Sequence, residues 1–104
     1  MSAGNIMRGQ VFWCDLGRGR KPWLVVSNNQ RNQNLDTVIA ARITTGKNAY
    51  IETVIALDKS DPLTGFVLVD DLAQFFHDET TDMAGAVAPQ TMSKVSAALR
   101  IALP

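Results

Sequence analysis

The chain has 104 residues, of which 46% are apolar and 19% are charged, and its formal net charge at pH 7 is zero. This length fits one domain, and this composition excludes a disordered or fibrous chain. The longest apolar runs are far shorter than the roughly 20 residues that a membrane-spanning helix needs. The single cysteine, Cys14, cannot form an internal disulfide, and no signal-peptide pattern opens the chain. We therefore expect a cytoplasmic protein with no membrane role.

The charges are distributed unevenly along the chain. Residues 1–48 hold seven basic and two acidic residues, a net charge of +5, whereas residues 49–104 hold three basic and eight acidic residues, a net charge of −5. Binding to nucleic acid depends on positive charge near the phosphates rather than on the sum over the chain. The basic half is therefore the candidate phosphate-binding part, and chance segregation of surface charge is the alternative.

Residues 1–7 are expected to form a flexible N-terminus, and residues 8–104 a single domain. Residues 10–16 are rich in β-forming side chains and end at a glycine-rich basic turn. Residues 22–27 are apolar almost without a break, which is typical of a central strand buried on both faces, and their proline stands first, where a missing N–H is tolerated. Two strands joined by a tight basic turn are predicted.

The middle of the chain predicts more strands. The polar residues 28–34 are expected to be a long loop, and residues 37–45, 50–57 and 65–69 are expected to be strands. Residues 71–76 are expected to form a short helical turn. Five short strands within about 60 residues favour a barrel over an α/β sheet.

Near the end of the chain, the spacing of the apolar residues changes from that of strands to that of a helix. Residues 89–103 begin with a proline, a good first helical residue, and their large apolar side chains recur at steps of three and four. The periodic positions are Met92, Val95, Leu99 and Leu103. An amphipathic C-terminal helix is predicted.

Several segments, taken in order, resemble one known family. Residues 8–11 (Arg-Gly-Gln-Val) open the first strand, and residues 15–17 (Asp-Leu-Gly) close it. Residues 21–28 follow as Lys-Pro-Trp-Leu-Val-Val-Ser-Asn, and residues 43–45 (Ile-Thr-Thr) end the third strand. With the closing helix at residues 89–103, this series resembles the MazF/PemK toxins over essentially the whole chain from residue 8.

The resemblance implies a mainly β fold, an SH3-like small β-barrel of about five to seven strands with short helices and a C-terminal amphipathic helix. It also implies a homodimer that cuts single-stranded RNA at selected sequences, leaving 2′,3′-cyclic phosphate and 5′-hydroxyl ends. No metal or other cofactor is expected, and a cognate antitoxin protein would inhibit the enzyme. Toxin endoribonuclease is therefore the expected function.

Lys21, Thr44 and Arg20 are the expected catalytic residues. The resemblance places Thr44 where the family has its active-site threonine. The residue before the proline of the second strand is commonly arginine in this family, whereas Lys21 stands there in this chain, with Arg20 before it. Attack by the RNA 2′-hydroxyl needs a proton acceptor, an acid for the leaving 5′-oxygen and positive charge on the phosphorane. The two cations can hold a phosphate and the threonine can donate to its oxygen, while the general base stays unassigned.

Further residues are expected to contact the RNA: Arg18, Asn28, Arg31, Arg42 and Thr45. The polar run that holds Asn28 and Arg31 could contact unpaired bases, and it is equally compatible with an ordinary loop. Whether Arg42 shares a face with Thr44 depends on the local twist of the strand.

Two other function classes stay open. Lys21 in place of the family arginine is compatible with a barrel that binds a protein without chemistry, such as a topoisomerase poison of related fold. A metal-dependent hydrolase could use His77 and nearby acidic residues, but these lack a defined ligand spacing and favour a solvated acidic face.

Cys14 has no base beside it in sequence, so a thiol nucleophile is not expected. Trp13 and Trp23 are expected in the core more than in base stacking.

Overall fold

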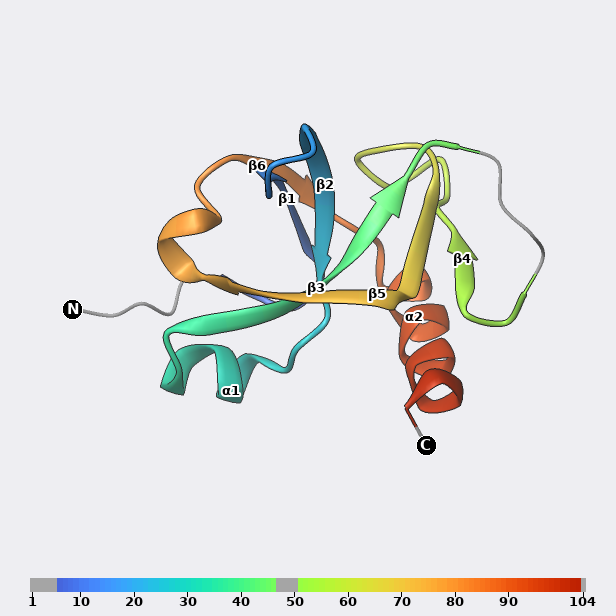
Figure 1. The fold of residues 1–104 in the computed structure, drawn as a ribbon. Helices are drawn as coiled ribbons and strands as arrows, with labels where there is room; N and C mark the ends of the chain where they lie inside the picture. The colour runs from blue at the N-terminus through green and yellow to red at the C-terminus, as the bar shows by residue number, and fades with distance from the viewer. Residues whose placement is uncertain (1–5, 47–50, 104) are drawn as a thin grey trace.

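Six antiparallel strands form one curled sheet in the computed structural model, which describes residues 6–46 and 51–103 (Figure 1). The strand order across the sheet is β4-β5-β3-β2-β1-β6. The strands are β1 (Gln10–Asp15), β2 (Arg20–Val25), β3 (Thr37–Thr44), β4 (Val54–Ala56), β5 (Phe66–Phe76) and β6 (Met83–Ala86). The helices are α1 (Asn29–Asn34), the 3₁₀ turn η1 (His77–Glu79) and α2 (Pro89–Ala102).

The mainly β fold expected from the sequence is confirmed. Strands β1, β2 and β3 lie within two residues of the predicted segments, and α2 covers all but the last residue of the predicted helix. The predicted flexible N-terminus lies mostly outside the described residues, as does the first residue of the strand predicted over residues 50–57. Among the described residues of that segment, strand geometry is confined to β4.

The predicted loop over residues 28–34 is wrong, because most of it forms α1. Asn28 caps this helix, and its side-chain oxygen accepts a hydrogen bond from the backbone N–H of Arg31 at 2.8 Å. Asn32 is fully buried, and its side-chain amide donates to the carbonyl oxygen of Ser27 at 3.0 Å. An N-cap and one satisfied buried amide stabilise a short helix that composition alone does not indicate.

The predicted helical turn over residues 71–76 is also wrong, because β5 continues through it to Phe76. In the pairing of β3 with β5 the register shifts between Ala41, opposite Leu72, and Arg42, opposite Leu68. The three residues between these partners form a bulge, and bulges bend a strand and increase its twist. Figure 1 shows β5 turning sharply near its middle. Strand β6 is a further element that the sequence did not predict.

The bend in β5 closes the sheet on itself. Phe75 near the end of β5 and Phe12 in β1 belong to strands three places apart in the sheet, yet their ring centroids lie 5.1 Å apart. The Phe75 ring also lies 4.9 Å from that of Trp23, and all three side chains are buried. These edge-to-face contacts form the core inside the curl, which gives the fold its half-barrel shape.

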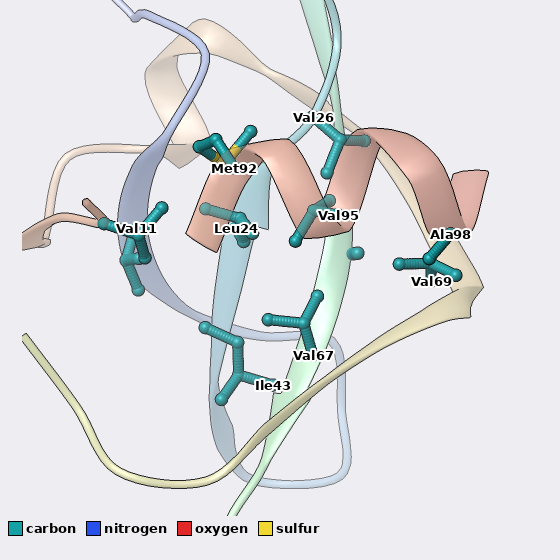
Figure 2. Close-up of a cluster of buried hydrophobic side chains, with 11 residues drawn as sticks. Val11, Leu24, Val26, Ile43, Val67, Val69, Met92, Val95 and Ala98 are labelled. Carbon is teal, nitrogen blue, oxygen red and sulfur yellow. The ribbon is translucent and has the colours of Figure 1, made fainter. Parts of the chain in front are cut away.

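Helix α2 covers a second apolar cluster on the opposite face of the sheet. Figure 2 shows Met92, Val95 and Ala98 of α2 facing the valines, leucine and isoleucine of the strands. These three helical residues recur at three-residue steps and are at most 7% exposed. Of the predicted apolar positions, Met92 and Val95 lie on this buried face, whereas Leu103 lies beyond the end of α2 and is 63% exposed.

The loop between β4 and β5 anchors the start of α2 through Asp61. Its carboxylate accepts hydrogen bonds from the Ala88 N–H at 2.7 Å, the Thr91 hydroxyl at 2.8 Å and the Asp58 N–H at 2.7 Å. Burial by itself would raise the pKa of Asp61, but these three hydrogen bonds together outweigh it and hold the pKa below its ordinary value of 3.8. The ionised carboxylate thus serves as a cap supplied from another part of the chain.

Replacing Asp61 with asparagine is expected to lower the free energy of unfolding by about 1–2 kcal/mol at neutral pH. Because the folded pKa of Asp61 is depressed, its contribution to stability is present above the ordinary pKa and is lost as the pH falls through the folded value. The stability difference between wild type and Asp61→Asn should therefore disappear in acid, as measured by urea unfolding from neutral pH downward. Asp78→Asn, at an exposed carboxylate, is the control and should show no such difference. A difference that persists unchanged in strong acid would contradict this account.

Among the residues the structure describes, no helix is long and apolar enough to cross a membrane.

Candidate active site

The turn between β1 and β2 is shaped by one carboxylate and two glycines. Asp15 Oδ1 accepts hydrogen bonds from the backbone N–H groups of Gly17 at 2.7 Å and Gly19 at 3.1 Å. Both glycines have positive φ angles, 99° and 93°, in a region that other residues rarely adopt. The turn therefore holds Arg18 between two glycines and returns the chain directly into β2.

A cavity of about 280 Å³ lies where β2 begins and β3 ends. Lys21, Thr44, Arg20 and Thr45 all line it, so the three expected catalytic residues surround one space. Lys21 is exposed, and its side chain makes no hydrogen bond or ion pair with any residue in the described part of the chain. Its ammonium group is therefore available to bind an anion such as a phosphate.

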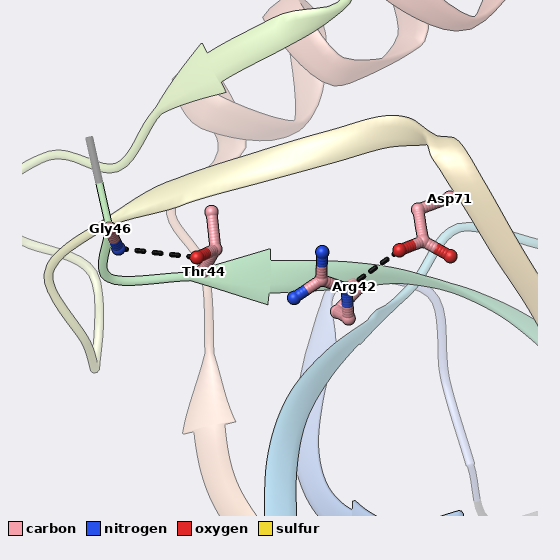
Figure 3. Close-up of polar contacts among 4 residues, drawn as sticks. All are labelled: Arg42, Thr44, Gly46 and Asp71. Atoms are coloured by element: carbon pink, nitrogen blue, oxygen red, sulfur yellow. Dashed lines mark hydrogen bonds and ion pairs between the residues drawn. The ribbon is translucent and has the colours of Figure 1, made fainter. Parts of the chain in front are cut away.

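Thr44 is the last residue of β3. Its Oγ1 accepts a hydrogen bond from the backbone N–H of Gly46 at 3.2 Å (Figure 3), which leaves the hydroxyl proton available for another acceptor. Gly65, with φ of 133°, passes against it so closely that a Cβ at this position would lie 2.3 Å from the Thr44 carbonyl oxygen. The position of Thr44 thus depends on a close backbone approach from the segment before β5.

Arg42 lines the same cavity as Thr44, which answers the question that the sequence left open. Its Nε donates to Oδ2 of Asp71 at 2.6 Å, and Figure 3 shows the guanidinium between Thr44 and Asp71 along β3. Asp71 belongs to the bulge in β5, because the register shift there begins directly before Leu72. The bulge therefore brings a carboxylate beside Arg42, and this contact orients the guanidinium.

Arg20 differs from its neighbour Lys21 in its surroundings. The Arg20 guanidinium forms an ion pair with Asp82, and its central carbon lies 5.3 Å from the centroid of the Trp13 ring. Successive side chains of a strand point to opposite faces, so Arg20 and Lys21 reach the cavity from opposite faces of β2. Of these two cations, Lys21 has the unpaired charge.

Asn28 and Arg31 do not line the cavity. They lie at the other end of β3, where Arg31 Nη1 donates to the carbonyl oxygen of Thr37 at 2.9 Å and Asn28 caps α1. Thr37 and Thr44 are the first and last residues of β3, and at about 3.3 Å per residue they are separated by roughly 23 Å. RNA contact by Asn28 and Arg31 stays a prediction, and the contacts that the structure gives them stabilise the fold.

Asp71 and Asp82 are the residues that sequence reasoning missed. Both ion pairs found among the described residues join a cation of the basic half to a carboxylate of the acidic half. The two halves of the sequence are therefore not two separate surfaces. The charged pair Asp70-Asp71, which interrupts the apolar run at the start of β5, is the sequence signal that could have indicated the bulge and its carboxylate.

Cys14 and His77 show no sign of chemistry. Burial raises the pKa of the Cys14 thiol, and the negative charge of Glu79 raises it further, so a thiolate is disfavoured. His77 Nε2 lies 3.1 Å from the Leu35 carbonyl oxygen, to which it can donate a hydrogen bond. In residues 6–46 and 51–103, no three histidine, cysteine or acidic side chains are grouped so that they could hold a metal ion.

Comparison with known proteins identifies the family and its fold. The family model of the PemK-like, MazF-like toxins of type II toxin-antitoxin systems matches residues 7–103. The chain belongs to this toxin family. The resemblance that the sequence motifs indicate is thereby confirmed.

Similar proteins support the same assignment. Endoribonuclease MazF1 from Mycobacterium bovis is 50% identical over 97 residues, which cover 93% of this chain and 91% of that protein. A solved endoribonuclease in complex with its cognate antitoxin, from a mycobacterial species, has a TM-score of 0.90 and 48% identity and covers 95% of this chain and 97% of that chain. The crystal structure of MazE-MazF (Form-II) from Deinococcus radiodurans, with a TM-score of 0.79 and 20% identity over 94% of each chain, shows the same fold. The enzyme class expected from the sequence, an endoribonuclease, is confirmed by these relatives.

Proposed function

We propose that this member of the toxin family cleaves single-stranded RNA without a metal, leaving 2′,3′-cyclic phosphate and 5′-hydroxyl ends. The supporting observation is the cavity lined by both Lys21, which has no partner among the described residues, and Thr44. In this reaction the nucleophile is the 2′-hydroxyl of the substrate itself. The protein therefore needs to supply positive charge, hydrogen bonds and proton transfer rather than an activated water.

The residues around the cavity take distinct parts in this proposal. Lys21 binds the phosphate and stabilises the charge that develops on it, and its ammonium can protonate the leaving 5′-oxygen, while the base that takes the 2′-hydroxyl proton stays unassigned. Thr44 donates its hydroxyl proton to a non-bridging oxygen. Arg42, oriented by its ion pair with Asp71, and Arg20, paired with Asp82, add further cations whose charges are partly neutralised.

The test is incubation of purified protein with a mixed-sequence single-stranded RNA in excess EDTA, followed by mapping of the cut positions and the chemistry of both ends. The proposal requires selective cuts with 5′-hydroxyl and 2′,3′-cyclic phosphate ends. Thr44→Ala should abolish most of this cleavage and keep the fold, because its side chain is half-buried at a strand end. RNA left intact across many sequences, or cleavage that EDTA stops, would refute the proposal.

We further propose a cognate antitoxin and a homodimer as the partners of this chain. A solved relative with 48% identity is in complex with its cognate antitoxin. The cations around the cavity, with Arg18 in the adjoining turn, would favour an acidic antitoxin segment.

Binding of such an antitoxin is expected to weaken at least about tenfold between 0.05 and 0.5 M salt, because exposed ion pairs are screened. Isothermal titration calorimetry at several salt concentrations would measure this dependence. Arg18→Ala should reduce the salt dependence, whereas Lys94→Ala, at an exposed position of α2, should leave it unchanged. An affinity that does not vary with salt would contradict an acidic segment over these cations.

A further inference from the structure

A second cavity, of about 450 Å³, adjoins the candidate active site. Lys21 and Arg42 line both cavities, so the two spaces meet at these side chains. A phosphate held by Lys21 would therefore place the neighbouring nucleotide at the entrance to the second cavity. Pockets for small ligands run from about 300 to 1,000 Å³, so this space can hold one nucleobase.

The walls of this cavity combine apolar surface with charged groups. Leu16, which is 55% exposed, supplies apolar surface beside the largely buried Trp23. Arg18 and Asp71 supply charges of opposite sign. An unpaired RNA base has apolar faces and a hydrogen-bonding edge, and its nucleotide carries a phosphate. The cavity offers a complementary group to each of these parts.

Asp71 is the group best placed to select among bases. Its Oδ2 accepts the Arg42 Nε–H at 2.6 Å, and no hydrogen bond to its Oδ1 from the described residues is found. The side chain is 47% exposed, so a ligand can reach it. A carboxylate beside a guanidinium is an acceptor with no proton to donate. Asp71 is therefore a fixed acceptor at the wall of the cavity.

We propose that the second cavity binds the base of a nucleotide next to the cleaved bond, and that Asp71 selects a base with an exocyclic amino group over uracil. This inference rests on the proposed function. Adenine, cytosine and guanine each present an amino group that can donate to a carboxylate. Uracil presents one N–H between two carbonyl oxygens, and these oxygens are repelled by a carboxylate.

Asp70 provides a matched control. It precedes Asp71 in the chain and carries the same side chain, but it does not line either cavity. Its Oδ2 accepts the hydroxyl proton of Thr53 at 2.6 Å, on the side of the edge strand β4. Substitution at Asp70 changes the same charge on the same bulge without changing the wall of the cavity.

The experiment compares wild type, Asp71→Asn and Asp70→Asn on an RNA pool with randomised positions around the cut, in excess EDTA, with the products sequenced. Wild type should disfavour uracil at one position flanking the cut. Asp71→Asn should reduce that discrimination at least about tenfold, since an amide both accepts and donates and can pair with uracil. Asp70→Asn should keep the wild-type preference.

Each outcome separates this inference from the proposed function. If wild type cleaves but Asp71→Asn keeps its base preference, or if wild type accepts uracil at every flanking position, the inference is refuted and the ribonuclease function stands. If wild type cleaves no RNA, the proposed function fails and the inference fails with it. If Asp71→Asn binds RNA but does not cleave it, binding replaces cleavage as the measurement. Affinities of wild type and Asp71→Asn are then compared for four RNAs that carry 2′-O-methyl at the cut and differ only in the flanking base. The same selectivity in both proteins refutes the inference.

Discussion

Replacing Lys21 with alanine is expected to slow RNA cleavage at least about 100-fold and to leave the fold unchanged. Loss of one group that stabilises transition-state charge typically costs about 10² to 10³ in rate. Lys21 is exposed and has no partner among the described residues, so nothing in the fold depends on its charge. Single-turnover cleavage at saturating enzyme measures the chemical step, and a urea unfolding curve checks the fold.

Two further variants test whether reduced cleavage by Lys21→Ala results from the missing positive charge at this position. Lys21→Arg keeps the positive charge at this position and should retain more activity than Lys21→Ala. Lys94→Ala removes one lysine charge from the exposed face of α2, far along the chain from the cavity residues, and should cleave like wild type. Full activity of Lys21→Ala would move the catalytic cation to another residue, with Arg42 as the next candidate on the cavity wall.

Replacing Gly65 with alanine is expected to lower the free energy of unfolding by at least about 3 kcal/mol and to impair cleavage. The φ angle of 133° is strained for any residue with a Cβ, which costs about 1–3 kcal/mol. The added Cβ would also lie 2.3 Å from the Thr44 carbonyl oxygen, and backbone must move to relieve this overlap. Because Thr44 and Thr64 both line the cavity, that movement changes the active site directly.

Gly17→Ala separates backbone strain from the steric overlap. Gly17 also has a positive φ, 99°, but a Cβ there would meet no atom within 4 Å. It should therefore cost only about 1–2 kcal/mol. Urea unfolding of both variants with wild type tests the comparison, and equal destabilisation by the two substitutions would show that the contact with Thr44 has no energetic role.

Much of the fold follows from patterns that are local in sequence. β-forming side chains and an almost unbroken apolar run predict β1 to β3, and the three- and four-residue spacing in α2 predicts its buried positions at Met92 and Val95. The local pattern failed at α1, where a cap at Asn28 and the buried Asn32 stabilise a helix in a polar run. It failed again in the second half of β5, whose apolar side chains pack in the curl of the sheet.

The sequence by itself determined the family, the strand that ends near Thr44, the basic turn that leads to Lys21, and the closing helix. The tertiary structure alone decided which cations remain unpaired: Arg20 is paired with Asp82, Arg42 with Asp71, and Lys21 is left without a partner among the described residues. Such pairs join residues far apart in the chain, and their geometry depends on strand register. A single bulge in β5 sets the strand register beside Arg42. The residues next to Arg42 in the sequence therefore do not determine which carboxylate pairs with it.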